Sequence, residues 1–153
     1  MRDNKWLAEK MYYLWENYFA DVARKNIVLI KFGKRSKRQL GSIRWGKTKS
    51  KKFIKFVTKQ NYVDDKRVSV ITITSFFKDM EIPEEVVLAT IAHEMCHYAH
   101  GFNSPLKQIY NHPHKGGVIR KEMAKRGLED IYKFSKKWLK DNWLLYLKKQ
   151  NVL

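Results

Sequence analysis

The sequence lacks the features on which secreted and membrane-spanning proteins depend. Its 153 residues include a single cysteine, so no disulfide can form within the chain, which favours a reducing compartment. There is no run of about 18 apolar residues, and the N-terminal stretch has no apolar signal-peptide core. We therefore expect an intracellular protein without a membrane span, located in the cytoplasm or, with nucleic acid, in a nucleoid or nucleus.

Acidic residues are absent from a long part of the chain. Residues 22–63 contain 14 Lys or Arg and no Asp or Glu, and the formal net charge of the whole chain is +17. A second basic region, residues 115–149, holds only four acidic residues. Self-repulsion on this scale destabilises a compact fold, so we expect a polyanionic partner, DNA that is single-stranded or contains junctions, rather than a merely solvated basic surface. The cations predicted to contact it are Lys34, Arg35, Lys37, Arg38, Arg44, Lys47, Lys49, Lys51 and Lys52.

Residues that interrupt regular structure are few, with three prolines and seven glycines, whereas aromatic residues are plentiful. This composition predicts one folded domain over residues 1–153, which we expect to be a monomer. Hydrophobic periodicity predicts helices at 4–24, 83–101, 118–126 and 128–150, strands at 26–32, 42–45 and 67–74, and a strand or short helix at 53–58. The strand at 67–74 has no polar face, so we expect it in the centre of the sheet. The order predicts an α+β fold, in which a small, mainly antiparallel sheet packs against an N-terminal helix, a central helix and C-terminal helices.

The helix at 83–101 contains the most informative pattern, PEEVVLATIAHEMCHYAHG. Apolar residues occupy nearly all sides of this helix, which predicts that the helix is buried. We interpret Cys96 as one of its core residues. His93 and His97 are about one turn apart, so both rings project from one face and can bind the same zinc ion. Glu94 is placed to accept a proton from a water molecule at that metal. This H-E-x-x-H pattern predicts a zinc-dependent hydrolase and, more specifically, favours a peptidase.

A catalytic zinc usually has three protein ligands, and the helix supplies only two of them. The third could be His112 or His114, from the turn-rich loop after the helix, or an acid such as Glu122. His100 shares the helix face but lies about 10 Å from His93 along the axis, too far to bind the same ion. We therefore expect His100 either at the rim of the site or behind the ligands, where it would support them.

Two segments, VLATIAHEMCHYAHG and HPHKGGVIRKEMAKRGL, together resemble the SprT-like zinc metallopeptidases, a family that includes a eukaryotic DNA–protein crosslink protease. The resemblance covers residues 81–128. It implies a minimal zincin-like protease domain with one catalytic Zn²⁺ and, as substrates, proteins bound or crosslinked to DNA. In this family a histidine at the end of the loop leads into the next helix, which implies His114 as the third ligand and leaves His112 as the alternative.

Two other interpretations remain open on the sequence alone. One is a nucleic-acid-binding protein with a structural or inactive zinc site, and the other is a metallopeptidase whose substrates are not linked to DNA. Trp45, Phe53 and Trp138 lie among cations and could stack on bases, although core packing is the simpler expectation for each. The basic loop at 33–41 is expected to be flexible and to contact phosphates.

Overall fold

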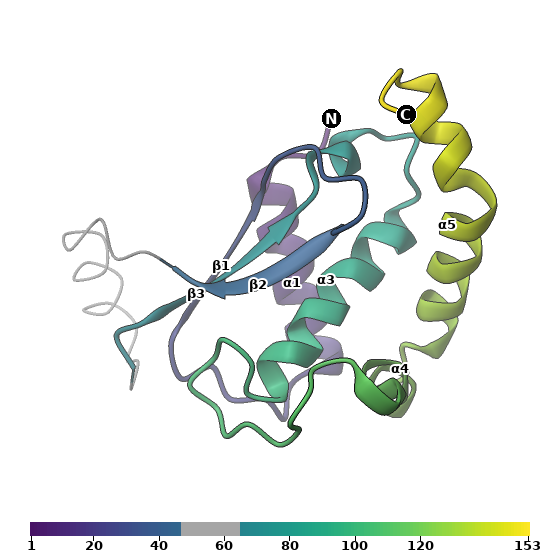
Figure 1. Ribbon diagram of the computed structural model, residues 1–153. Helices are drawn as coiled ribbons and strands as arrows, with labels where there is room; N and C mark the ends of the chain where they lie inside the picture. Colours follow the sequence, from purple (N-terminus) through teal and green to yellow (C-terminus); the bar gives the residue numbers. More distant parts are fainter. Residues whose placement is uncertain (47–64) are drawn as a thin grey trace.

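The computed structural model describes residues 1–46 and 65–153. Within them a three-stranded sheet carries helices on one face, and the C-terminal helices lie beside this layer (Figure 1). The α+β class predicted from the sequence is confirmed. The predicted element at 53–58 lies outside the described residues, as do Phe53, Lys47, Lys49, Lys51 and Lys52.

The sheet consists of β1 (Ile27–Phe32), β2 (Gly41–Trp45) and β3 (Val68–Ile73), in the order β1-β3-β2. β3 is the central strand, as predicted from its lack of a polar face. It pairs in parallel with β1 and antiparallel with β2, so the described sheet is mixed rather than mainly antiparallel. The reason is that β3 inserts between β1 and β2, which are neighbours in the sequence but not in the sheet.

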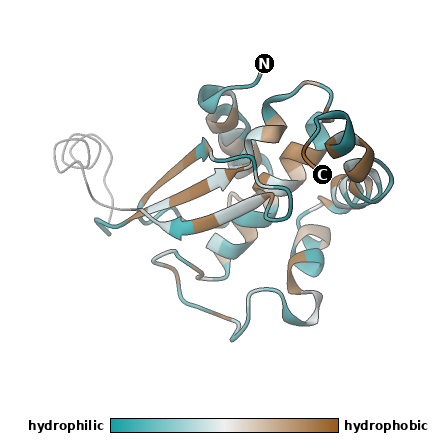
Figure 2. Cartoon of the chain, turned by 45° about the horizontal axis from the view of Figure 1, so that its top comes forward, coloured by the Kyte–Doolittle hydropathy of each residue, from teal (hydrophilic) through white to brown (hydrophobic). Residues whose placement is uncertain are grey.

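One face of the sheet is buried beneath two helices. Ile30, Ile71 and Ile43 form a row across the three strands in register, and all three are buried. α1 (Asn4–Tyr18) packs on β1, while α3 (Glu84–Ala99) packs on β2 and β3. Hydrophobic residues are accordingly frequent in the strands, whereas the loops around them are mostly hydrophilic (Figure 2).

The first helix, α1, is shorter than the predicted helix at 4–24. It begins as predicted, because Asp3 accepts a hydrogen bond of 2.8 Å from a backbone N–H in the first turn. It ends at Tyr18, and the chain then turns back so that Trp15 Nε1 donates to the carbonyl of Val22 at 2.9 Å. Val22 is buried and therefore fits the spacing of apolar residues in the predicted helix. In the structure it lies in the turn after α1 rather than in the helix.

The other three helices match their predicted ranges closely. α3 is followed by Gly101, whose φ of 84° is the left-handed conformation that ends many helices. A 3₁₀ turn at Lys115–Gly117 leads into α4 (Val118–Lys125), and α5 (Glu129–Lys149) then runs beside α3 (Figure 1). Among the described residues, no helix is both long and apolar enough to span a membrane.

Candidate metal centre

Three histidines meet at one point of the structure. His93 and His97 lie on α3, and His114 comes from the loop that precedes α4. The Nε2 atom of His114 lies 3.3 Å from that of His93 and 3.0 Å from that of His97. Among the described residues this cluster includes no other histidine, and His112 is an exposed loop residue outside it. The fold thus brings His114 to the pair on the helix.

The spacing of these nitrogen atoms fits a tetrahedral metal. With zinc–nitrogen bonds of about 2.0–2.1 Å, two tetrahedral ligand atoms lie roughly 3.3–3.4 Å apart. The two separations at His114, 3.3 and 3.0 Å, are close to that value. Three imidazoles also leave a fourth position for water or substrate, as in catalytic rather than closed structural zinc sites. The donor set could therefore hold a metal ion such as zinc, with one position open.

The two helix histidines are neutral at physiological pH. Burial, and then the charge of His114, lowers the pKa of His93 from 6.5 to about 4. Burial, and then the neighbouring histidines, lowers the pKa of His97 to about 3. Each ring therefore keeps the free lone pair that metal binding requires. Phe102 lies edge-on to the His97 ring, with 6.2 Å between centroids, and this contact restricts the orientation of the ring.

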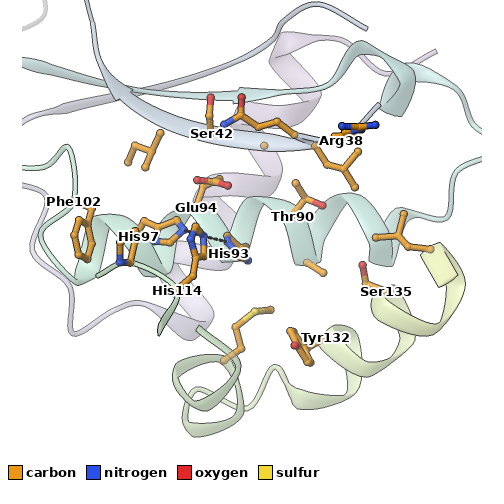
Figure 3. Close-up of a pocket in the computed structure, with 18 of the residues that line it drawn as sticks. Arg38, Ser42, Thr90, His93, Glu94, His97, Phe102, His114, Tyr132 and Ser135 are labelled. Atoms are coloured by element: carbon orange, nitrogen blue, oxygen red, sulfur yellow. Dashed lines mark hydrogen bonds between the residues drawn. The ribbon is translucent and has the colours of Figure 1, made fainter. Parts of the chain in front are cut away.

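Glu94 is buried beside the histidines and points toward β2 (Figure 3). Burial raises the pKa of its carboxyl group from 4.5 to about 8. The first residue of β2, Gly41, makes this enclosure possible: a Cβ atom there would lie 3.1 Å from Glu94 Oε1 and 2.9 Å from Thr90 Cγ2. The strand can approach α3 this closely only because position 41 has no side chain. The Glu94 carboxyl group is therefore confined between helix and strand.

A groove of about 620 Å³ contains the histidine cluster and Glu94. The loop before β2 and β2 itself line one side, α3 forms the floor, and α4 and α5 line the other side (Figure 3). Away from the histidines the groove continues past Thr90 on α3 toward Tyr132 and Ser135 on α5. Its volume is within the range of about 300–1,000 Å³ that is typical of ligand-binding sites.

Among the described residues, no strand pairs with the edge of β2 that borders this groove. The Thr74 N–H donates to the Leu40 carbonyl at 2.8 Å, which sets the phase of the ladder between β2 and β3. Because antiparallel ladders alternate, Gly41 and Ile43 direct their N–H and C=O groups away from β3. In agreement, the Ile43 carbonyl accepts a hydrogen bond of 2.9 Å from Asn103 Nδ2. The edge groups that remain lie beside the cluster, where an extended chain could extend the sheet.

A buried chain of hydrogen bonds fixes the loop that carries Asn103. The hydroxyl of Ser69 on β3 donates to the Asn103 carbonyl at 2.7 Å and accepts from Asn26 Nδ2 at 2.9 Å. The Tyr98 hydroxyl on α3 donates to Asn26 Oδ1 at 2.7 Å. These bonds tie the loop to the sheet and to α3, so this end of the groove has a defined shape.

The other candidate ligands, His100 and Glu122, bind each other instead of the cluster. His100 is 1% exposed, which excludes the rim position and leaves the supporting one, and its Nε2 atom lies 2.9 Å from Glu122 Oε1. Glu122 also pairs with Arg126 at 3.1 Å, and Arg126 pairs with Asp21 at 2.6 Å. This chain of contacts joins α3, α4 and the segment after α1. Since α4 follows His114 almost directly, Glu122 holds in place the element that carries the third histidine.

The predicted nucleic-acid-binding residues within the described chain are all exposed: Lys34, Arg35, Lys37, Arg38 and Arg44. They lie on β2 and on the loop before it, and Arg38 and Arg44 line the groove.

This loop is anchored rather than flexible. The Trp143 indole donates to the Lys37 carbonyl at 2.9 Å, and Ser36 exchanges two hydrogen bonds with the Thr74 hydroxyl group. The sequence prediction of flexibility is therefore wrong, because side chains from α5 and from the end of β3 hold the loop.

The aromatic residues and the cysteine occupy packed positions. Trp45 and Trp138 are both half-buried, and the Arg67 guanidinium group lies 4.1 Å from the centre of the Trp45 ring. Trp138 packs against the core. Cys96 is fully buried, as predicted, and burial raises the pKa of its thiol. These residues need no functional role to explain them.

Comparison of the chain with protein-family models, with curated proteins and with solved structures finds no match. The function of this chain is therefore inferred from the geometry of its own residues. Three of those residues, Gly41, Asn103 and Tyr132, were not singled out from the sequence. Only Gly41 had a signal there, as a glycine between a basic loop and a predicted strand.

Proposed function

We propose that this chain is a zinc-dependent endopeptidase of the SprT-like type, acting on proteins bound or crosslinked to DNA. The observation that carries the proposal is the meeting of His114 with His93 and His97 in an open groove. Glu94 lies in the same groove, in the order that the H-E-x-x-H pattern requires for peptide hydrolysis. The resemblance to SprT-like peptidases supplies the substrate class.

The three imidazoles would hold Zn²⁺, which when bound supplies a Lewis acid for water and the peptide carbonyl. Glu94 accepts the proton of the attacking water and passes it to the leaving amine. A cation beside Glu94 favours the ionised form that this role needs, and so opposes the effect of burial on its pKa. Gly41 keeps the carboxyl group close to the reacting atoms by packing the strand against it.

The edge of β2, which pairs with no other described strand, supports an extended protein substrate. Gly41 and Ile43 offer backbone groups to a chain that adds to the sheet, and such pairing aligns a peptide without requiring a particular sequence. Broad acceptance of sequences suits a peptidase that must degrade whichever protein is attached to DNA.

The charge supports the link to nucleic acid. Arg38 and Arg44 line one side of the groove and Lys136 the other, on a chain of net charge +17. Counterion release would concentrate such a protein on DNA, next to the proteins that DNA carries. The single cysteine fits an intracellular location for this activity.

The test is cleavage of a DNA-binding protein by the purified chain, with and without single-stranded DNA and a chelator. We expect DNA to stimulate cleavage, and chelation to abolish it. Glu94→Gln should abolish cleavage while zinc content stays at the wild-type level, whereas Glu85→Gln, an exposed position on the same helix, should cleave normally. Full activity in Glu94→Gln, or zinc-free wild-type protein that remains active, would refute the assignment.

A further inference from the structure

No described helix covers the face of the sheet that lies opposite α1 and α3. Two rows of side chains cross it in register: Lys31–Thr72–Ser42 and Leu29–Val70–Arg44. Lys31 and Arg44 are exposed. Leu29, an apolar residue on the edge strand β1, is also 37% exposed. A sheet that contains antiparallel pairing can keep one solvated face, so the polar and charged groups on this face are accessible to a ligand.

A hollow of about 270 Å³ lies on this side of the sheet. Ser42 and Thr72 are directly opposite each other on β2 and β3, so their hydroxyl groups lie on the same face within the hollow. Lys34 and Arg44 line it as well, and none of its described lining residues is acidic. Two cations and two hydroxyl groups thus surround one small space.

The backbone around the hollow is held in place. The carbonyl of Lys34 accepts a hydrogen bond of 3.2 Å from the Ser75 N–H, and the Ser36 N–H donates to the Thr74 hydroxyl at 3.0 Å. At Gly33 the chain passes so close to Thr72 that a Cβ atom would collide with the threonine side chain. The site is therefore largely formed before a ligand arrives, which lowers the entropy cost of binding.

This combination of groups matches a phosphodiester. Arg and Lys supply charge-assisted hydrogen bonds to phosphate oxygens, and Ser and Thr hydroxyl groups are common additional donors to the nucleic-acid backbone. The charge of the chain is complementary to such a partner, since residues 22–63 contain 14 cations and no acid. Arg44 and Gln39 line both the hollow and the catalytic groove, so the two sites meet across β2.

We propose that this hollow, lined by Lys34, Ser42, Thr72 and Arg44, binds a backbone phosphate of nucleic acid on the uncovered face of the sheet. The inference rests on the nucleic-acid part of the proposed function and gives it a location. A strand bound there lies on the far side of β2 from the histidines. The groove then stays free for a protein attached to that strand, and DNA acts as a tether rather than as an inhibitor.

The test is fluorescence anisotropy with a fluorescein-labelled oligothymidylate, measured between about 50 and 200 mM salt. We expect Lys34→Ala/Arg44→Ala to weaken binding by about tenfold or more. The slope of log K against log salt should fall by about 0.7, since the hollow holds one phosphate and each phosphate contact on a single strand contributes about 0.7. Thr72→Val keeps the charge and the shape, and should weaken binding several-fold at an unchanged slope. The matched control, Lys133→Ala/Lys137→Ala, removes the same charge from two exposed positions on α5 and should leave binding within twofold.

Three outcomes would overturn the inference. They are equal losses in the two double variants, wild-type affinity in Thr72→Val, and competition by polyglutamate as effective as by unlabelled oligonucleotide at equal charge. Failure of this inference can be distinguished from failure of the peptidase proposal. Zinc-dependent cleavage by the wild-type protein, together with oligonucleotide binding that the hollow variants leave unchanged, would refute the inference alone. Binding that follows the expected pattern in a chain without zinc-dependent cleavage would refute the peptidase proposal alone.

Discussion

The buried carboxyl group of Glu94 leads to a quantitative prediction about the metal-free protein. Its pKa is raised from 4.5 to about 8 by burial, so the folded state keeps a proton that the unfolded state loses. Between these two values the unfolding free energy therefore falls as pH rises, by at most about 1.4 kcal/mol per pH unit. From pH 5 to pH 7 the loss is about 2–3 kcal/mol, because two pH units lie within this window. Glu94→Gln has no proton to lose and escapes this decline.

The assay is urea denaturation of chelator-treated wild-type protein and Glu94→Gln at several pH values from 5 to 8. The stability of Glu94→Gln relative to wild type should increase by about 2–3 kcal/mol between pH 5 and pH 7. Titration of His93 and His97 affects both proteins alike and cancels in the difference. Glu85→Gln, exposed on the same helix, should show no such trend. A difference that stays constant with pH would refute the idea that Glu94 is held as a neutral acid.

Zinc should reverse the trend, because a cation beside Glu94 lowers its pKa and stabilises the ionised form. With saturating zinc, the advantage of Glu94→Gln at pH 7 should shrink or disappear. If zinc leaves it intact while binding to the protein, then the ion does not lie next to this carboxyl group.

Three further predictions concern the elements around the site. His114→Ala should reduce zinc content measured by mass spectrometry to near zero, whereas His112→Ala should bind zinc stoichiometrically; the reverse pattern would assign the third ligand to His112. Glu122→Ala should weaken zinc about 10–100-fold in a chelator competition, because α4 loses the partner that positions it, while the exposed control Glu129→Ala should bind zinc as wild type does. Gly41→Val should lower the unfolding free energy by about 1–3 kcal/mol in thermal denaturation and should impair cleavage, because its side chain collides with α3; normal stability would contradict the close approach of the strand.

The elements with strong local signals were predicted well. α3 was predicted from charge in its first turn, continuous apolar content and a terminal glycine, and all of these act within a few residues. α4 and α5 were found for the same reason, with Gly127 between them. The end of α1 was missed because buried Val22 continues the helical pattern although the Trp15 side chain stabilises a turn there.

Pairing between distant segments was not predictable. The sheet was expected to be mainly antiparallel, but β3 lies between β1 and β2 and pairs in parallel with β1. The alternation of side chains in the sequence predicts which residues of a strand share a face. It does not predict which strand lies next to it, because the same backbone groups can pair with any neighbour. The anchoring of the basic loop by Trp143, more than 100 residues later, depends on the same kind of contact.

The sequence by itself determined that His93, Glu94 and His97 share one site. Helical geometry is local: hydrogen bonds over four residues fix the relative directions of the side chains, so the spacing alone places two imidazoles on one face. Only the tertiary structure decided which histidine completes the cluster. His114 reaches the pair because a loop folds back and the buried contact between His100 and Glu122 holds α4 against α3. The enclosure of Glu94 beneath Gly41 was likewise decided there, since it depends on packing between strand and helix that no local spacing specifies.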